Sequence, residues 1–307
     1  MIPPDSPYWN QVRLLVEVLP AVAEEDCFAL KGGTAINLFL RDMPRLSVDI
    51  DLAYVPVNDY KTSRDEIDAA LRRIRDVLLS YSPPYEVTIG ANDGSGRIDT
   101  LNVRLGDAQV KIEVNPVLRG SVHPIQVLGV RPIVEEHIGF ARTAILALED
   151  VYAGKLVAAL DRQHPRDLFD VMLLFENEGL SETLFRAFLV YLIGHKGSMA
   201  DTLNPNRKPL DQLYRTQFES MANRETSVEE LTQVRERLIS EVHERLGDRE
   251  KRFLLSVKQL RPEWDLLGIA GVDALPAVQW KLHNLGRMSK PAHEKAVARL
   301  AELFEKI

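Results

Sequence analysis

The feature that most constrains this chain is the stretch from Lys31 to Tyr54, where a Gly-Gly-Thr turn and a short apolar segment precede two acids, Asp49 and Asp51. A hydrophobic residue lies on either side of each acid, which is the alternation of a half-buried β-strand. Successive side chains of a strand point to opposite faces, so both carboxylates share one face. Neighbouring carboxylates repel each other, and a bound Mg²⁺ or Mn²⁺ ion compensates for this repulsion. We therefore expect Asp49 and Asp51 to be metal ligands.

The glycine turn adds a second element to this interpretation. Gly32, Gly33 and Thr34 stand at the expected start of a helix, where backbone N–H groups attract phosphate. Ser47 lies two residues before Asp49, so it shares the face of the acids. Phosphate donors near a carboxylate-held metal indicate that the chain binds a nucleoside triphosphate (NTP). The alternative is a tight strand-to-helix connection without a ligand.

Length, cysteine content and charge limit the class of protein. The 307 residues suffice for one large domain or two modest ones, and we expect two. The single cysteine excludes an intramolecular disulfide and a cysteine-bound zinc site, and no apolar run is as long as a bilayer span. We therefore expect a cytoplasmic protein without a membrane partner. The net charge of −7 argues against a non-specific nucleic-acid coat protein.

Before residue 130 the sequence pattern predicts an α+β lobe. Its elements are expected in this order: a helix at 8–24, a strand at 28–30, a helix at 34–40, the strand of the two acids, a helix at 63–80, and strands at 85–89, 98–105 and 109–117. Ser63 is the expected N-cap of the long helix, with Glu66 in the capping-box position. The result is a mixed β-sheet flanked by helices.

After about residue 130 the pattern becomes almost entirely helical. Helices are expected at 147–162, 166–176, 181–193, 210–222, 227–245, 249–260 and 291–307. We therefore predict a catalytic lobe at 1–130 and an all-helical lobe at 131–307.

Four further residues are candidates for the same chemistry. Glu113, on a later strand, is a possible third metal ligand, or else an ordinary solvated acid. Lys155 and Arg162 lie two turns apart on one side of a helix, where they can grip a triphosphate, although Lys155 can also simply extend to solvent. Asp170, in the next helix, is either an orienter of Lys155 or a general base, or only part of an i,i+4 pair with Arg166.

Three blocks of sequence carry a family resemblance. They are KGGTAINLF followed by RLSVDIDL, then KIEVNPV, then LEDVYAGKLVAALDRQHPRDLFDV, and they span roughly 30–174. With these blocks the chain resembles the AbiEii/AbiGii (MenA-like) family of nucleotidyltransferase toxins, within the DNA polymerase β-like nucleotidyltransferase superfamily. The resemblance implies that Asp49 and Asp51 bind metal, that Lys155 holds the nucleotide, and that Asp170 is the fourth acid of the active site, with Asp167 as its rival.

The resemblance also implies a function. Members of this family transfer NMP from an NTP with release of pyrophosphate, in some cases to the 3′ acceptor end of tRNA, which blocks translation. They work in toxin–antitoxin systems linked to phage defence, with a separately encoded antitoxin as partner. Two alternatives are the same chemistry on a small molecule resembling an aminoglycoside or on a protein, and a non-catalytic nucleotide-binding regulator.

Overall fold

The computed structural model describes residues 8–90, 94 and 96–307, and the chain divides into two compact units. Unit 1 contains the described residues up to Val151 together with Glu219–Glu225, and unit 2 contains Tyr152–Phe218 and Thr226–Ile307. The division after Val151 differs from the expected boundary at residue 130. The reason is that a strand between these positions, Arg142–Ile145, belongs to the sheet of unit 1.

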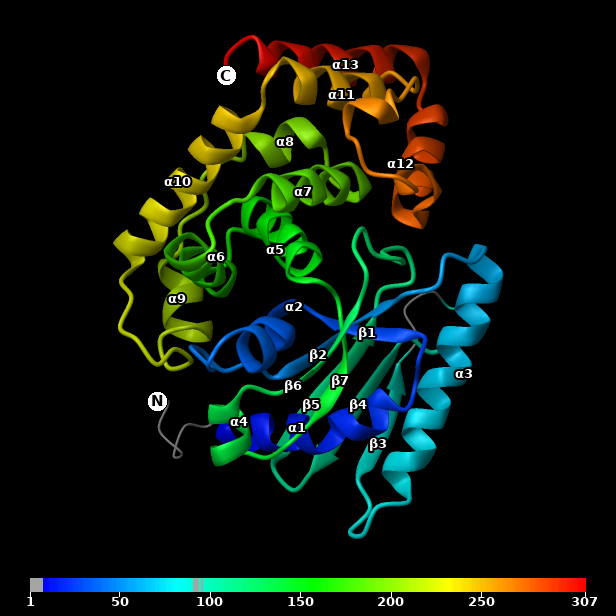
Figure 1. Cartoon of the computed structure of the whole chain (residues 1–307), viewed down its shortest axis with the longest axis vertical. Helices are drawn as coiled ribbons and strands as arrows, with labels where there is room; N and C mark the ends of the chain where they lie inside the picture. The colour runs from blue at the N-terminus through cyan, green and yellow to red at the C-terminus, as the bar shows by residue number, and fades with distance from the viewer. Residues whose placement is uncertain (1–7, 91–93, 95) are drawn as a thin grey trace. The chain divides into compact units, whose positions relative to one another are not determined.

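Unit 1 is built on a seven-stranded mixed sheet in the order β3-β4-β5-β2-β1-β7-β6 (Figure 1). The strands are β1 (Phe28–Lys31), β2 (Asp49–Tyr54), β3 (Glu86–Gly90), β4 (Thr100–Leu105), β5 (Ala108–Val114), β6 (Gln126–Gly129) and β7 (Arg142–Ile145). Strand β2 runs parallel to β5 and antiparallel to β1, and β1 runs parallel to β7. The predicted mixed sheet is confirmed.

Helices of unit 1 pack on this sheet through apolar faces. Helix α1 (Trp9–Ala23) buries residues at helical spacing and contacts β5 and β7. Helix α3 (Tyr60–Leu79) contacts α1, β3 and β4. The remaining helices of this unit are the short α2 (Gly32–Thr34), the π-helix η1 (Ala35–Leu40) and α4 (Pro132–His137).

The predicted N-cap of the long helix is wrong. The carboxylate of Asp59 accepts a hydrogen bond from the Thr62 backbone N–H at 3.0 Å, so α3 begins almost one turn earlier than expected. Ser63 lies inside this first turn and donates its hydroxyl to the Asp59 carbonyl at 2.8 Å. Glu66 accepts a hydrogen bond from the Tyr54 hydroxyl, so it does not complete a capping box.

One segment of unit 1 comes from far along the sequence. Residues Glu219–Glu225 lie beside the loop that precedes β2. The Leu46 N–H donates to the Met221 carbonyl at 2.8 Å, and the Asn223 N–H donates to the Pro44 carbonyl at 2.9 Å. These bonds place Arg45 opposite Ala222 in an isolated antiparallel bridge.

Unit 2 is helical throughout, as the sequence pattern predicts. Helix α5 (Leu148–Arg162) begins in unit 1 and continues into unit 2. The elements that follow are α6 (Pro165–Asn177), α7 (Glu182–Gly194), α8 (Met199–Leu203), α9 (Asp211–Gln217), α10 (Val228–Arg245), α11 (Asp248–Lys258), the 3₁₀ turns η2 (Trp264–Leu266) and η3 (Val272–Ala274), α12 (Pro276–Gly286) and α13 (Lys290–Phe304). Contacts of α10 with α6, α12 with α7 and α11 with α13 form the core of this unit.

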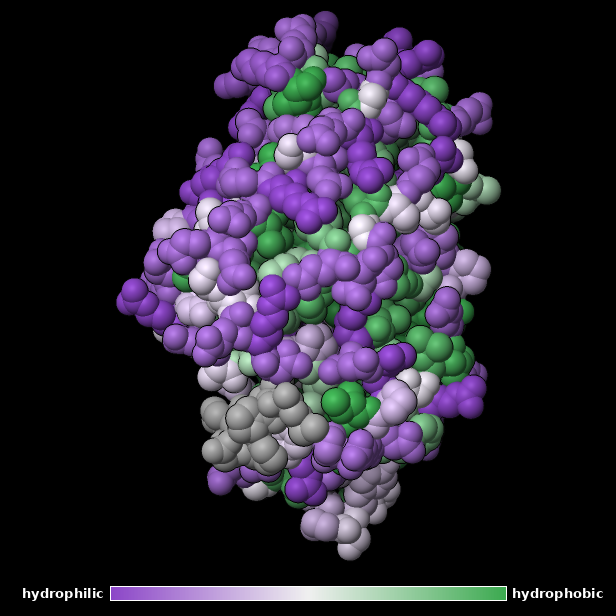
Figure 2. Space-filling view, turned by 60° about the vertical axis from the view of Figure 1, so that its left-hand side comes forward, coloured by the Kyte–Doolittle hydropathy of each residue, from purple (hydrophilic) through white to green (hydrophobic). Residues whose placement is uncertain are grey.

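On the face drawn in Figure 2, hydrophilic side chains predominate and apolar ones lie between them. The large exposed hydrophobic side chains are far apart in the sequence, for example Val57 and Phe140 in loops and Trp280 in a helix. None of the helices in the described part of the chain combines the length and hydropathy that a bilayer crossing requires.

Candidate active site

Strand β2 presents its two acids as the alternation predicts. Ile50 and Leu52 are fully buried, whereas Asp49 is exposed and Asp51 is half-buried. Asp51 pairs in register with Lys31 of β1 and with Glu113 of β5. The acids therefore lie at the end of the sheet where β1 leads into the glycine turn.

The glycine turn packs directly against Asp51. Gly32 has a φ of +72°, a conformation that side-chain-bearing residues rarely adopt. A Cβ added to Gly32 would lie 2.5 Å from the carboxylate oxygen Oδ2 of Asp51. Within unit 1, the close approach of these two residues brings the turn and the acid strand together.

Replacing Gly32 with alanine is therefore expected to have two unfavourable effects, one on the backbone and one on the Asp51 side chain. The left-handed backbone costs about 1–2 kcal/mol for a residue with a Cβ, and the methyl group displaces the Asp51 carboxylate. Gly106→Ala is the matched control, because Gly106 also has a positive φ of 58° but a Cβ there meets nothing within 4 Å. Urea denaturation should show similar backbone costs for both variants, and only Gly32→Ala should lose the nucleotidyl transfer that the family resemblance implies. Full activity in Gly32→Ala would contradict the assignment of the turn to the site.

Hydrogen bonds join the helix after the turn to the start of β2. The Thr34 hydroxyl donates to the Asp49 carbonyl at 2.5 Å, and its oxygen lies 2.9 Å from Oγ of Ser47. The side-chain amide of Asn37 donates to the Gly33 carbonyl at 2.8 Å. Thr34 and Ser47 are both buried, so their hydroxyls act within the fold, and their predicted contact with nucleotide stays a prediction.

A buried arginine completes the surroundings of the turn. A Cβ added to Gly33 would lie 2.8 Å from Nη2 of Arg45 and 2.9 Å from Oγ of Ser47. Arg45 is 2% exposed and donates through Nη1 to the Leu46 carbonyl at 2.9 Å. Sequence reasoning missed Arg45, because nothing in a loop sequence indicates that one of its arginines turns inward.

Glu113 shares an ion pair with a neighbour on its own strand. Its carboxylate accepts a hydrogen bond from the Lys111 ammonium group, two residues earlier on the same face. This bond raises the pKa of Lys111, and the charges of Asp49 and Asp51 add to the effect. The ammonium group of Lys111 therefore offsets part of the negative charge on this face.

The donor set fits a hard divalent cation that is shared with a phosphate ligand. Mg²⁺ is usually held by one or two carboxylates together with substrate phosphates and water. Asp49 and Asp51 provide two carboxylates on one strand face. Within the described residues no three His, Cys, Asp or Glu side chains gather into a site of their own, and a role for Glu113 as the third ligand stays a prediction.

Unit 2 contains a second cluster of the predicted residues. The Lys155 Nζ atom lies 2.8 Å from Oδ1 of Asp167 and 2.9 Å from Oδ2 of Asp170. Arg162 lies 2.8 Å from Oδ2 of Asp167. Lys155 is 7% exposed and Asp170 is fully buried, so this is a buried ion-pair cluster between α5 and α6. The sequence did not decide whether Asp167 or Asp170 is the active-site acid. In the structure the carboxylates of both contact Lys155.

Helix α6, which carries both aspartates, has a histidine cap. Nδ1 of His164 accepts a hydrogen bond from the Arg166 N–H at 3.1 Å, and Pro165 occupies the first helical position. Nε2 of His164 lies 3.1 Å from the side-chain oxygen of Gln217, so Nε2 carries the proton. Burial lowers the pKa of His164 below its usual 6.5.

This cap predicts a specific pH dependence. Because the pKa of His164 is lower in the folded than in the unfolded state, its contribution to stability is complete above pH 6.5 and is lost as the pH falls through the folded-state value. Between pH 7.5 and pH 5.0, the unfolding free energy measured by urea denaturation should fall less for His164→Asn than for the wild type, since Asn caps helices without titrating. Equal drops in both proteins would exclude this role.

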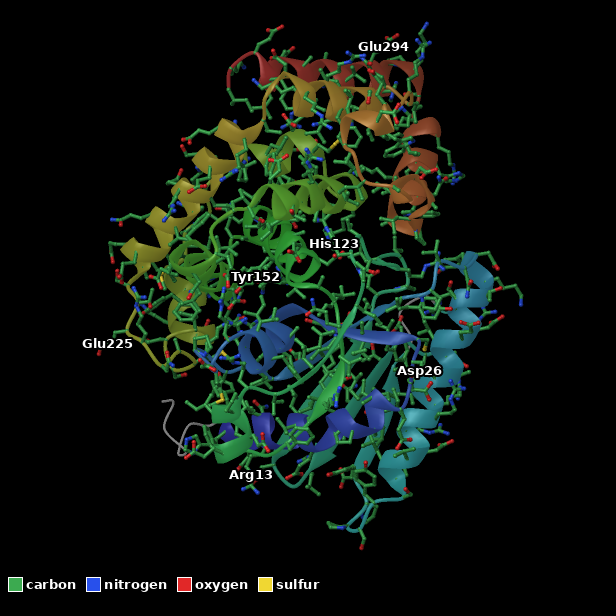
Figure 3. All side chains as sticks on the ribbon, in the orientation of Figure 1. Arg13, Asp26, His123, Tyr152, Glu225 and Glu294 are labelled. Carbon is green, nitrogen blue, oxygen red and sulfur yellow. The ribbon has the colours of Figure 1, made fainter. Side chains whose placement is uncertain are left out.

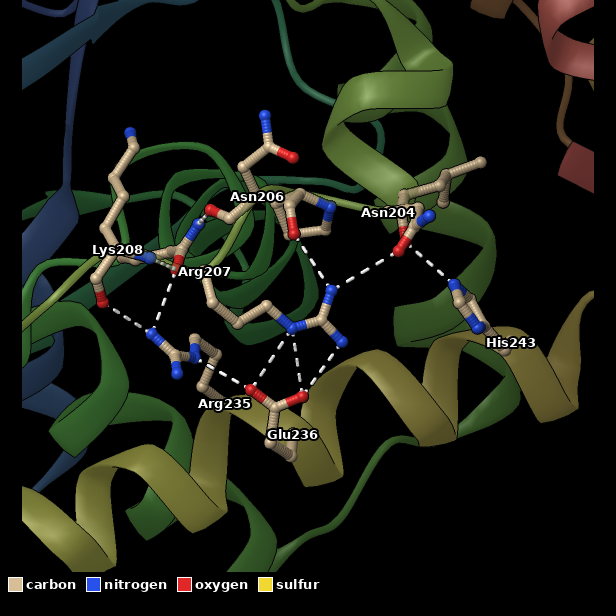
Figure 4. Close-up of polar contacts among 10 residues, drawn as sticks. Asn204, Asn206, Arg207, Lys208, Arg235, Glu236 and His243 are labelled. Carbon is tan, nitrogen blue, oxygen red and sulfur yellow. Dashed lines mark hydrogen bonds and ion pairs between the residues drawn. The ribbon is translucent and has the colours of Figure 1, made fainter.

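The sequence also suggests that arginines such as Arg72, Arg73 and Arg75 line a groove for a polyanion, but each of these three pairs with an acid. Arg72 pairs with Asp68, Arg73 with Glu25, and Arg75 with Asp76. In unit 2, Arg207 lies 2.9 Å from Glu236 and holds the pKa of this carboxyl below its usual value (Figure 4). These contacts show arginines stabilising local structure, and a basic groove stays a prediction.

Polar contacts also fix the corner between α5 and α6. The side chain of Gln163 donates to the Asn206 carbonyl at 2.7 Å and accepts from the Lys208 N–H at 3.0 Å. Arg235 of α10 donates to the same Gln163 oxygen at 3.1 Å. It also donates to the Lys208 carbonyl at 2.7 Å (Figure 4). This network holds the turn that brings Asp167 back to Lys155.

A surface hollow of unit 1 lies apart from these residues. It is lined by Glu24, Glu25, Asp26, Cys27, Glu66, Ala69, Arg73, Asp76 and Val77, none of which belongs to the predicted site. Burial raises the pKa of the Cys27 thiol to about 11, so this cysteine is a poor nucleophile.

A mixed sheet on which a glycine turn packs against a strand with two acids defines a nucleotidyltransferase-like lobe. The family model described as nucleotidyl transferase AbiEii toxin, type IV toxin–antitoxin system, matches residues 13–284. The chain therefore belongs to the AbiEii family of nucleotidyltransferase toxins, and it is a nucleotidyltransferase. This result confirms the resemblance read from the sequence.

A solved structure has a similar fold. It is the nucleotidyltransferase toxin MenT4 of Mycobacterium tuberculosis H37Rv, with a TM-score of 0.60 and 14% sequence identity. The similarity covers 96% of this chain and 92% of MenT4, so it extends over both units. Among curated protein sequences there is no match.

Proposed function

We propose that this toxin transfers an NMP unit from an NTP to RNA, at the 3′ acceptor end of tRNA, and thereby blocks translation in the cytoplasm. The observation that carries the proposal is the contact between the glycine turn and the acid strand, where Gly32 lies against Asp51. In the proposal Asp49 and Asp51 hold Mg²⁺ or Mn²⁺, with Glu113 as a further ligand. The ion supplies charge neutralisation of the phosphates when it is bound.

Each residue has a defined part in the proposed reaction. The backbone N–H groups of Gly32, Gly33 and Thr34 bind phosphate oxygens, and Lys155 and Arg162 from the helical unit neutralise the triphosphate. The RNA 3′-oxygen attacks the α-phosphorus, the bond from the α-phosphorus to the bridging oxygen breaks, and pyrophosphate leaves. The proton of the attacking hydroxyl passes to a carboxylate, either Glu113 or Asp170.

Asp170 has a second role in this proposal. Because it is fully buried and 2.9 Å from Nζ, it holds the Lys155 ammonium group in one position. A charged group held in place costs little reorganisation when charge develops on the leaving pyrophosphate. In this proposal the main role of Asp170 is therefore to position Lys155.

The experiment separates RNA from other acceptors. Purified protein is incubated with each α-labelled NTP and Mg²⁺ or Mn²⁺, in the presence of total tRNA, an aminoglycoside mixture or a protein extract. Label is expected in the tRNA pool, and 3′-end sequencing identifies the tRNA and the number of nucleotides added. Label in only the small-molecule or protein pool would overturn the RNA proposal and support the same chemistry on another acceptor.

The family also implies a cognate antitoxin as partner. We propose that it suppresses the toxic effect of this enzyme in the cell. Co-expression of the gene encoded next to the toxin should restore growth and should lower the amount of extended RNA 3′ ends. Restored growth with unchanged RNA ends would contradict this form of suppression.

A further inference from the structure

The loop between β5 and β6 contains a histidine that a buried acid holds in place. The histidine is His123, which is labelled in Figure 3. Asp150 accepts hydrogen bonds from the Val122 N–H at 2.7 Å, the His123 N–H at 2.9 Å and Nδ1 of the His123 ring at 2.9 Å. The side chain of Asp150 is 0% exposed, whereas that of His123 is 23% exposed. All of these residues belong to unit 1.

The contact with Asp150 decides which ring nitrogen is available. A carboxylate accepts, so Nδ1 of His123 carries a proton, and in the neutral ring Nε2 is then a hydrogen-bond acceptor. Nε2 has no hydrogen-bond partner among the residues that the structure describes. The ring therefore offers one oriented acceptor to solvent or to a ligand.

Strand register places this pair at the same end of the sheet as the glycine turn. Leu30 of β1 pairs with Ile145 of β7, and the Leu146 N–H donates to the Leu30 carbonyl at 3.0 Å. Asp150 lies in the first turn of α5, directly after this point. Since β7 is two strands away from β2, the end of β7 that leads to Asp150 lies about 10 Å across the sheet from the strand of Asp51.

We propose that His123 binds the nucleoside part of the NTP, with Nε2 accepting a hydrogen bond from a ribose hydroxyl or a base amino group. The inference rests on the proposed function, since it takes the triphosphate to lie on the glycine turn. A base for the attacking hydroxyl must lie within about 3 Å of the proton it accepts, whereas the strand that leads to Asp150 is two strands away from that of Asp51, so we do not assign His123 that role. His123 is instead assigned to the nucleoside end of a nucleotide whose phosphates lie near Asp51.

The simpler explanation is a clamp, in which Asp150 only fixes the loop. Two backbone N–H groups already bind Asp150, so a clamp does not require an imidazole. Asparagine at position 123 separates the two explanations. Its side-chain amide can replace Nδ1 as the donor to Asp150, but it has no atom in the place of Nε2. His123→Ala removes both contacts.

The test measures binding of a non-hydrolysable NTP analogue by calorimetry, without RNA, for the wild type, His123→Asn and His123→Ala. His123→Asn should keep the thermal midpoint of the wild type and should weaken binding about tenfold, as for one lost hydrogen bond. The measurement is repeated with NTP analogues of all four bases. An equal loss of affinity for the four analogues indicates a contact with the ribose, and an unequal loss indicates a contact with the base. Both results support the contact.

Wild-type binding by His123→Asn, with a lower thermal midpoint for His123→Ala, would show that His123 is only a clamp and would overturn the proposal. The assay contains no acceptor, so it is independent of the RNA proposal. A protein that binds NTP but labels no RNA would refute the proposed acceptor while leaving the comparison at position 123 decisive.

Discussion

Replacing Asp49 or Asp51 with asparagine is expected to lower nucleotidyl transfer by about 10³-fold, the size of effect seen when a main charge-stabilising group is removed from an active site. The reason is that asparagine keeps the shape of the side chain but removes the negative charge that attracts a divalent cation. Transfer is measured as labelled NMP incorporated into tRNA, and binding of Mn²⁺ is measured directly by calorimetry in the presence of an NTP analogue.

Stability should change little in these two variants. Asp49 is exposed and Asp51 is half-buried, and loss of one of two neighbouring carboxylates also removes their repulsion. Asp107→Asn is the matched control, because Asp107 is an exposed acid of the same sheet, in the turn between β4 and β5. Near-normal transfer by Asp49→Asn and Asp51→Asn would remove the acid pair from the mechanism.

Replacing Lys155 with methionine is expected to abolish transfer and to lower the unfolding free energy by about 3–5 kcal/mol, as happens when one partner of a buried ion pair is lost. Asp167 and Asp170 would then lose the ammonium group that contacts both of them, while Arg162 would still contact Asp167. Urea denaturation measures the stability, and the tRNA labelling assay measures the transfer.

A double variant separates folding from catalysis. Lys155→Met with Asp170→Asn removes one positive and one negative charge, and leaves Asp167 paired with Arg162. The double variant should recover most of the lost stability, because the buried charges balance again. It should still be inactive, since no ammonium group is left for the triphosphate. Transfer by the stable double variant would show that Lys155 has a structural role alone.

Local patterns explain what the sequence could predict. The alternation around Asp49 and Asp51 depends only on strand geometry, so the shared face follows from a few neighbouring residues. Most helices of unit 2 were predictable for the same reason, because apolar spacing and caps such as Ser181 and Ser227 are local signals, but α8 and α12 were not expected.

Other features depend on contacts between distant residues. Strands β6 and β7 are only four residues long, and they become strands by pairing with each other and with β1. The contact of Asp167 with Lys155 requires the chain to reverse at Gln163, a residue with a φ of +55° that polar neighbours hold in place. The His123–Asp150 pair and the inward turn of Arg45 likewise have no local signal.

Contacts of Glu219–Glu225 with the loop before β2 bear on when the enzyme becomes competent during synthesis. A ribosome makes the glycine turn and the acid strand early, but the partners of Pro44 and Leu46 emerge only after much of unit 2 has been translated. In a nascent chain, Asp49 and Asp51 are therefore present before the loop that holds Arg45 beside Gly33 has its hydrogen-bond partners. A polypeptide released prematurely, before Met221, lacks this support, so truncated products of the gene are expected to be harmless to the cell that makes them.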